Sequence, residues 1–170
     1  MFSNNLYIVG LMGSGKTSIG KLLSKILDFT HIDIDEEIIK QTNLSISEIF
    51  KTHGESYFRQ LESRLLNSVS KQNNIVVSTG GGVILSNDNI DIMKNTGRII
   101  HLDISLQNQI MRVKNKKNRP LLNVDNIEEK LREMKDLRDY TYKSISNYSI
   151  ITDKRSKNDI AQEIVNKIND

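Results

Sequence analysis

Residues 10–17, which read GLMGSGKT, restrict the possible fold more than any other part of the chain. They have the spacing G-x-x-x-x-G-K-T, follow a β-branched and aromatic run at 6–9, and lead into a helical pattern at 16–27. A glycine-rich loop between a strand and a helix is the setting of a P-loop, whose backbone N–H groups surround phosphate. The alternative is a chance glycine-rich turn, which the matching flanks on both sides disfavour. The sequence therefore predicts a bound nucleoside triphosphate.

The side chains of this loop fit the same prediction. Lys16 can reach the β- and γ-phosphates of a nucleotide, and the hydroxyl of Thr17 can coordinate Mg²⁺. The N-terminus of the following helix adds a favourable partial positive charge. The residues predicted to bind the nucleotide here are Gly13, Ser14, Gly15, Lys16, Thr17 and Ser18.

The size and composition of the chain predict one domain in a reducing compartment. A chain of 170 residues fits one domain, which can bury about 70% of the surface that the unfolded chain exposes. The chain has no cysteine, which excludes disulfides, thiolate metal sites and cysteine nucleophiles. No apolar run approaches a membrane span, and residues 1–5 lack the features of a secretory signal. We expect a soluble, cytoplasmic monomer with no membrane partner.

The charge of the chain allows two interpretations. A net charge of +3 and a pI near 9.0 suit either a nucleic-acid partner or an enzyme whose substrates are anions. Aromatic residues make up only 5% of the chain and there is no Trp, so few side chains could stack on single-stranded bases. We therefore favour anionic small-molecule substrates and expect no nucleic-acid partner.

Apolar runs alternate with helical patterns along the whole chain, which predicts an α/β fold with a parallel sheet covered on both faces. The predicted strands are 6–10, 30–34, 75–79, 98–103 and 148–152. The predicted helices are 16–27, 45–51, 56–72, 88–95, 105–114, 126–144 and 157–169. In such folds ligands bind beyond the carboxyl ends of the strands. Six of the nine glycines follow the first and third strands, as expected for backbone that approaches a ligand.

Two carboxylates close the second predicted strand. Asp33 and Asp35 are two residues apart, so in an extended strand they would project to the same side beyond the sheet. Beside a P-loop, one carboxylate can hold Mg²⁺, directly or through water, and the other can accept the proton of an attacking hydroxyl. The alternative is a polar strand end that caps a helix beginning near Glu36. The neighbouring P-loop favours the functional interpretation.

Several further residues or motifs have weaker local cases. Arg59 lies near a helix start, where it can clamp a carboxylate or merely pair with Glu55 or Glu62 on the helix surface, and locally the surface pair is preferred. The triplet Gly80, Gly81 and Gly82 offers amide donors to a small polar ligand, or is a flexible turn. Just before it, the hydroxyl of Ser78 can contact a Mg²⁺-bound water. Arg138 is a second anion clamp or a helix-surface charge, and Arg155 packs on a nucleotide base or lies in an ordinary loop.

A basic segment at 112–122 contains Pro120, the only proline of the chain. The proline should end the preceding helix and stiffen the turn after Arg119. This is typical of a lid that closes over phosphates and lets Arg119 reach the developing charge while water is expelled. A solvated run of charges and a nucleic-acid patch are the alternatives.

In order and spacing, these motifs together resemble the shikimate kinase family over nearly the whole chain. The residues that carry the resemblance are the P-loop 10–17, Asp33-Ile-Asp35, Gly54–Arg59, Gly80–Gly82, Arg119-Pro-Leu121 and the later pair Arg138 and Tyr142. The resemblance implies a three-layer α/β/α P-loop kinase fold with a five-stranded parallel sheet in the order 2-3-1-4-5. It also implies a single kinase domain at 1–170, with a mobile lid at about 113–124 and a substrate-binding segment at about 35–62.

The implied activity is transfer of the γ-phosphoryl group of ATP, with Mg²⁺, to the 3-hydroxyl of shikimate in aromatic amino-acid biosynthesis. By family role, Lys16 and Arg119 stabilise the transferred phosphoryl group, and Asp35 contacts the reacting hydroxyl as the base. The other implied roles are metal binding by Thr17 and Asp33, substrate binding by Arg59, Arg138 and the amides of Gly80, Gly81 and Gly82, and nucleotide binding by Arg112, Arg119 and Arg155. The sequence departs from the family at Ser156-Lys157, where a proline often follows the arginine, and in a lid that is more basic and less rich in glycine.

The sequence also allows two other functions. A kinase resembling gluconate kinase would act on a substrate that also carries a carboxylate and hydroxyls, although the D-x-D and G-E-x-x-F-R motifs together favour shikimate. A nucleotide-regulated binding module or nucleic-acid partner would show no rapid turnover of a small acid, and its binding would collapse with added salt.

Overall fold

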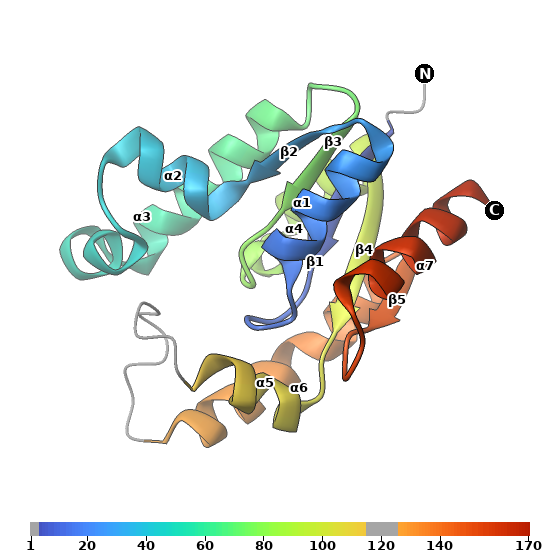
Figure 1. The fold of residues 1–170 in the computed structure, drawn as a ribbon. Helices are drawn as coiled ribbons and strands as arrows, with labels where there is room; N and C mark the ends of the chain where they lie inside the picture. Colours follow the sequence, from blue (N-terminus) through green and yellow to red (C-terminus); the bar gives the residue numbers. More distant parts are fainter. Residues whose placement is uncertain (1–3, 115–125) are drawn as a thin grey trace.

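The computed structural model describes residues 4–114 and 126–170, and these form a three-layer α/β/α arrangement around one sheet (Figure 1). The sheet has five parallel strands in the order β2-β3-β1-β4-β5, as the family resemblance implied. The strands are β1 (Asn5–Val9), β2 (Thr30–Asp33), β3 (Ile75–Ser78), β4 (Gly97–Asp103) and β5 (Tyr148–Ile151). The fold class predicted from the sequence is therefore confirmed.

Helices cover both faces of the sheet. The helices are α1 (Lys16–Leu27), α2 (Ile34–Thr42), α3 (Ile46–Val69), α4 (Asn87–Thr96), α5 (Leu106–Val113), α6 (Ile127–Ile145) and α7 (Lys157–Asn169), and η1 (Val83–Leu85) is a short 3₁₀ helix. Helices α1 and α7 pack together on one face, whereas α3, α4 and α6 lie on the other (Figure 1).

The central strand shows why the sheet must be covered twice. All five residues of β1 are buried, and successive side chains point to opposite faces. Tyr7 and Val9 join the core cluster under α3, α4 and α6, whereas Leu6 and Ile8 join the cluster under α1 and α7. Because the strand is apolar on both sides, it is stable only between two layers of helices.

The segment that follows β2 differs from the prediction. The strand ends at Asp33, one residue earlier than expected, and α2 begins at Ile34 rather than near Glu36. The side chain of Asp33 caps this helix by accepting hydrogen bonds from the backbone N–H groups of Asp35 (3.1 Å) and Glu36 (3.2 Å). The cap, rather than the β-branched residues nearby, decides where the strand gives way to the helix.

The two helices predicted at 45–51 and 56–72 form one long element, α3, with a break at Gly54. Gly54 has φ 83° and ψ 169°, a conformation outside the helical region that a residue without a Cβ adopts at little cost. The break lies five residues before Arg59. The second half of α3 therefore starts near that arginine, as the sequence indicated.

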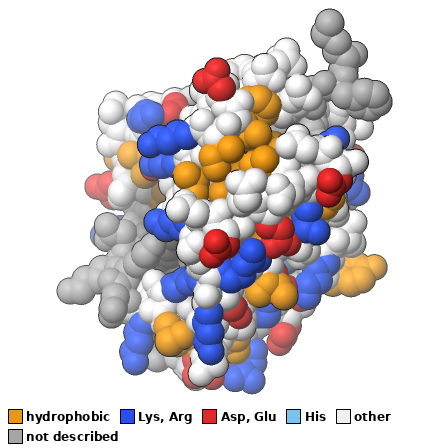
Figure 2. Space-filling model, turned by 45° about the vertical axis from the view of Figure 1, so that its right-hand side comes forward, with side chains coloured by type: hydrophobic (Ala, Val, Ile, Leu, Met, Phe, Trp, Pro, Cys, Tyr) orange, Lys and Arg blue, Asp and Glu red, His pale blue; other side chains and the backbone are white. Residues whose placement is uncertain are grey.

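The charged side chains on the surface are relevant to whether a nucleic-acid partner is expected. Figure 2 shows one face on which Lys and Arg side chains are interspersed with Asp and Glu, so this face carries no continuous basic stripe. Within residues 4–114 and 126–170, no helix is long and apolar enough to cross a bilayer. The same face also has a patch of hydrophobic side chains, and the expected monomeric state remains a prediction.

Candidate active site

The predicted chemical residues lie around a cavity at the carboxyl edge of the sheet, with a volume of about 480 Å³. The ends of β1, β2 and β3 and the starts of α1, α2 and α7 surround it. Its lining includes Gly13, Ser14, Gly15, Lys16, Thr17, Ser18, Asp33, Asp35, Gly80, Gly81, Arg112 and Arg155. Arg138 contacts this lining at Gly81, and Arg59 lies against the neighbouring Gly82.

The ammonium group of Lys16 lies against the P-loop itself. Its Nζ donates hydrogen bonds to the carbonyl oxygens of Gly10 (2.7 Å) and Leu11 (3.0 Å). A charged donor held over the loop is in position to exchange these carbonyls for the phosphate oxygens of a nucleotide. Ser14 is 1% exposed, and its hydroxyl has no hydrogen-bond partner among the described residues. The loop therefore has donors available for phosphate oxygens.

Thr17 and Asp33, the two residues predicted to hold metal, are in direct contact. The hydroxyl of Thr17 donates to Oδ2 of Asp33 at 2.6 Å, while Oδ1 of Asp33 is used in capping α2. The capping interpretation of Asp33 is therefore confirmed for Oδ1, while Oδ2 faces the P-loop and metal binding by this residue stays a prediction. The pair supplies two adjacent oxygen ligands of the kind that Mg²⁺ prefers.

Asp35 reaches the cavity by a different route from the one predicted. The prediction that Asp33 and Asp35 project together from one extended strand is wrong, because Asp35 lies in the first turn of α2. The change from strand to helix at Asp33 still directs both carboxylates toward the cavity, which both residues line. Asp35 Oδ1 also lies close to the glycine triplet, 3.3 Å from the position that a Cβ on Gly80 would take.

Arg59 belongs to an ion-pair cluster on α3 and also contacts the glycine triplet. It donates to Glu55 through Nε and Nη2 and to Glu62 through Nη1, at 3.2, 3.0 and 2.8 Å, so the predicted helix pairing is present. Its guanidinium lies over the ring of Phe58 at 5.1 Å. A Cβ on Gly82 would be only 2.3 Å from the nearest guanidinium nitrogen, so only glycine allows this approach.

Glu62 is a site component that the sequence analysis treated only as a possible surface partner. Its side chain is completely buried, and a Cβ on Gly80 would lie 2.5 Å from its Oε1. Burial raises the pKa of the Glu62 carboxyl above its ordinary value, the attraction of Arg59 opposes this rise, and the charge of Asp35 adds to it. The i,i+3 spacing from Arg59 was the available signal, but spacing alone could not show the burial.

Arg138 approaches the triplet from α6, which follows the triplet in the sequence, whereas Arg59 precedes it. Its Nη1 donates to the carbonyl oxygen of Gly81 at 3.2 Å, and the hydroxyl of Tyr142 donates to the same oxygen. A Cβ on Gly81 would lie 3.5 Å from the carbonyl oxygen of Gly10, which also accepts from Lys16. Both arginines that the sequence could not place are therefore at the glycine triplet, beside the P-loop.

All three carbonyl oxygens of the glycine triplet accept hydrogen bonds from within the protein. The carbonyl of Gly80 accepts from Val83 N (3.3 Å), and that of Gly82 accepts from Leu85 N (3.0 Å). The carbonyl of Gly81 is taken by α6, as described above. Within residues 4–114 and 126–170, no group accepts a hydrogen bond from the three N–H groups. The triplet is therefore a row of backbone donors, suited to the hydroxyls of a small ligand.

His31 and Ser78 support the start of α1 from below. The hydroxyl of Ser78 donates to the carbonyl oxygen of Lys16 at 3.0 Å, and its contact with a metal-bound water stays a prediction. Nε2 of His31 lies 2.9 Å from the same hydroxyl, and since the hydroxyl proton is already used, the imidazole is the donor. This contact was not predicted, because it joins β2, β3 and α1 across 47 and 62 residues.

Two more predicted residues, Arg112 and Arg155, line the cavity. Arg112 donates to the carbonyl oxygens of Gly13 (3.1 Å) and Thr152 (2.9 Å), and thus ties α5 to the P-loop. Arg155 lines the cavity and pairs with Glu163 at 2.6 Å. Arg119 lies outside the described residues, and so does the lid predicted at about 113–124, apart from Val113 and Lys114.

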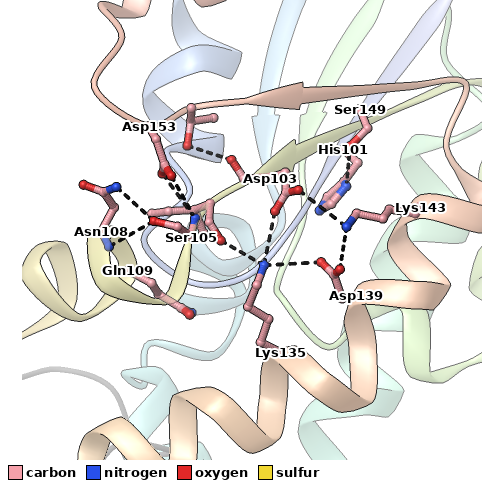
Figure 3. A network of polar contacts seen from close by, with 12 residues as sticks. His101, Asp103, Ser105, Asn108, Gln109, Lys135, Asp139, Lys143, Ser149 and Asp153 are labelled. Atoms are coloured by element: carbon pink, nitrogen blue, oxygen red, sulfur yellow. Dashed lines mark hydrogen bonds and ion pairs between the residues drawn. The ribbon is translucent and has the colours of Figure 1, made fainter.

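A network of ion pairs fixes α6 against the end of β4 (Figure 3). Nζ of Lys135 contacts Asp103 (3.2 Å) and Asp139 (3.4 Å), and Nζ of Lys143 contacts the same two carboxylates at 3.7 and 2.6 Å. His101 lies beside the two carboxylates, so the group has three potential metal ligands within 4.8 Å of one another. The two ammonium groups already neutralise the carboxylates, which makes this a structural network and not a metal centre.

This network predicts a specific loss of stability in acid. Burial lowers the pKa of His101 to about 4, although Asp103 and Asp139 oppose the shift. The unfolded chain binds this proton near pH 6.5 and the folded chain only near pH 4, so the free energy of unfolding should fall by up to about 3 kcal/mol between these values. Urea unfolding from pH 7 to pH 4 should show a shallower decline for His101→Phe. An identical decline in both proteins would contradict the assignment.

A second hollow, of about 840 Å³, lies at the opposite, amino edge of the sheet. Lys71, Lys94 and Arg98 line it together with several amide side chains. None of the residues predicted from the motifs faces this hollow. Although it is the larger of the two, the chemistry lies at the carboxyl edge, as expected for a parallel α/β sheet.

Comparison with known proteins gives one consistent family. The profile of the shikimate kinase family matches residues 12–169. The shikimate kinase of Sulfurihydrogenibium sp. is 39% identical over 164 residues, which cover 96% of this chain and 97% of that protein. The shikimate kinase of Acinetobacter baumannii strain AYE is 38% identical over 164 residues, which cover 96% of this chain and 91% of that protein.

Solved structures agree with this family. A shikimate kinase from Acinetobacter baumannii in complex with shikimate superposes with a TM-score of 0.95 at 37% identity, covering 98% of this chain and 93% of that chain. The enzyme from Aquifex aeolicus gives 0.85 at 33% identity, covering 97% and 96%. A gluconokinase from Sinorhizobium meliloti, at 0.65 and 13% identity with coverage of 99% and 93%, shares the fold alone. The matched sequence, the sheet order and the P-loop together show that this chain belongs to the shikimate kinase family.

Proposed function

We propose that this protein transfers the γ-phosphoryl group of ATP to the 3-hydroxyl of shikimate. The single observation that carries the proposal is the convergence of Arg59 and Arg138 on the glycine triplet beside Lys16. Two guanidinium groups suit a substrate that carries a carboxylate, and the row of amide donors suits its hydroxyls. The family of the chain supports the same substrate.

The oxygen pair of Thr17 and Asp33 fits a Mg²⁺ ion. Their side-chain oxygens are 2.6 Å apart at the P-loop, and both are hard donors. Mg²⁺ held there would neutralise charge on the β- and γ-phosphates. Lys16 would add a second positive charge at the phosphates, after it releases the carbonyls of Gly10 and Leu11.

Asp35 is the residue that we assign as the base. It lines the cavity next to Gly80 and Gly81, so a hydroxyl bound to the triplet would lie near its carboxylate. Accepting the proton of that hydroxyl as the phosphorus–oxygen bond forms is the role of a general base in such transfers. Arg112 and Arg155 would contact the nucleotide, and Arg119 would contact the transferred group.

A kinase of the gluconate type is the main competing function. Its substrate also bears a carboxylate and hydroxyls, so the arginines alone do not separate the two possibilities. The low identity to the gluconokinase, against 37–39% to several shikimate kinases, argues against it. A binding module without turnover is disfavoured by the residues that line the cavity. Among the described residues, the lysine, the metal-binding pair and the base that we assign to phosphoryl transfer all line it.

An ADP-release assay over a panel of acceptors tests the proposal. The panel contains shikimate, gluconate, other hydroxy acids and sugar acids, and nucleotides, each with MgATP. We expect rapid turnover with shikimate and a kcat/KM for gluconate that is lower by at least about two orders of magnitude, as sites built for particular hydroxyls discriminate strongly. Higher turnover with gluconate would favour the competing kinase, and ADP release with none of the acceptors would favour the binding module.

A further inference from the structure

The carbonyl oxygen of Gly81 is the one carbonyl of the glycine triplet that side chains hold. Arg138 and Tyr142, one turn apart on α6, both donate to it. The carbonyls of Gly80 and Gly82 instead accept from backbone groups of their own turn. The orientation of the central peptide of the triplet is therefore set by α6 and not by the local turn.

Tyr142 is held rigidly in this contact. The residue is 0% exposed, and its ring stacks on the imidazole of His101 with centroids 5.0 Å apart and planes 11° apart. The imidazole is itself fixed, because its Nδ1 lies 2.9 Å from the hydroxyl of Ser149. Burial raises the pKa of the Tyr142 phenol above its ordinary value, so the hydroxyl keeps its proton and remains a donor.

The geometry of a peptide group links this contact to Gly82, the residue against which the guanidinium of Arg59 lies. In a planar trans peptide the C=O and the N–H point in opposite directions, so fixing the carbonyl of Gly81 also fixes the N–H of Gly82. Among the described residues, no group accepts from that N–H. A donor that points in one defined direction binds a hydroxyl better than one that must be reoriented.

We propose that Tyr142 is a positioning residue for the acceptor substrate, which orients the Gly81–Gly82 peptide so that its N–H faces a substrate hydroxyl. This inference rests on the proposed function and assigns to it a residue that does not itself touch substrate. The ion pairs of Lys135 and Lys143 with Asp103 join α6 to the end of β4 and so hold the helix in the register that the contact needs (Figure 3).

The variant Tyr142→Phe tests the proposal, because it removes the hydroxyl and keeps the ring that stacks on His101. We expect the KM for shikimate to rise roughly three- to tenfold, as for loss of one neutral hydrogen bond. The KM for ATP should stay within about twofold, because the hydroxyl that is removed donates to Gly81 and not to the P-loop. The amide resonance of Gly82 in a ¹⁵N-labelled protein should also shift, since its peptide loses a donor to the carbonyl.

Tyr140→Phe is the matched control. Tyr140 lies on the same helix, is 81% exposed, and should show wild-type kinetics and an unchanged Gly82 resonance after the same substitution. Wild-type KM values and an unmoved Gly82 resonance in Tyr142→Phe would overturn the proposal. So would equal increases in both KM values, which would indicate a general structural defect. Absence of turnover in the wild-type protein would instead overturn the proposed function.

Discussion

Replacing Asp35 by Asn should lower kcat with shikimate by roughly 10²- to 10⁴-fold, the range of a lost general base. The amide cannot accept the proton of the attacking hydroxyl, yet it has the same shape and can remain next to Gly80. The affinity for ATP should change little, because the lysine and the threonine of the P-loop are untouched. Steady-state kinetics with shikimate, together with a direct titration of ATP binding, would measure both quantities.

Glu36→Gln is the control for this variant. Glu36 is the next residue on α2, is exposed, and pairs with Lys21 at 2.9 Å away from the cavity. The same carboxylate-to-amide change there should leave kcat within about twofold, as is usual for an exposed ion pair of little energetic weight. Near-normal turnover of Asp35→Asn would refute the role of Asp35 as the base.

Replacing Arg59 by Ala should chiefly raise the KM for shikimate, by roughly 10- to 100-fold, since hydrogen bonds between charged groups are worth about 1.5–3 kcal/mol. Removal of the guanidinium also leaves the buried carboxylate of Glu62 without its ion-pair partner. We therefore expect a lower melting temperature in addition, because an unpaired buried charge is costly. Steady-state kinetics and thermal unfolding would separate the two effects.

Arg64→Ala is the comparison for this variant. Arg64 lies on the same helix, is exposed, and within the described residues forms one side-chain hydrogen bond, to Gln60 at 3.4 Å. Its removal should alter neither the KM for shikimate nor the melting temperature appreciably. An unchanged KM in Arg59→Ala would remove Arg59 from the carboxylate clamp. A KM that recovers in Arg59→Lys would show that charge alone, without the planar fork, is sufficient.

Most of the fold could be predicted from local sequence patterns. Each of these patterns depends on residues that are close together in the sequence. They are the alternation of strands and helices, the segments that flank the P-loop, and the buried apolar run of β1. The predictions that were wrong concern the ends of elements, where two local signals compete. Asp33 ends β2 and caps α2 with the same side chain, and Gly54 breaks α3 without ending it.

The site was harder to predict, because its contacts join residues far apart in the chain. Arg59 had a good local explanation as a partner of Glu55 and Glu62, and that pairing exists. What the spacing could not show is that Glu62 is buried and that the guanidinium also lies against Gly82. Likewise, nothing near Arg138 in the sequence indicates that it reaches Gly81, 57 residues away.

The sequence by itself determined that this chain binds phosphate at a P-loop and forms a parallel α/β sheet, because both depend on spacing within one or two elements. The family resemblance supplied the strand order and the substrate. Only the tertiary structure decided that Arg59 and Arg138 meet at the glycine triplet, and that Tyr142 holds the central peptide between them. Helix packing on the sheet sets these distances, and helix packing depends on the whole core and not on any single segment.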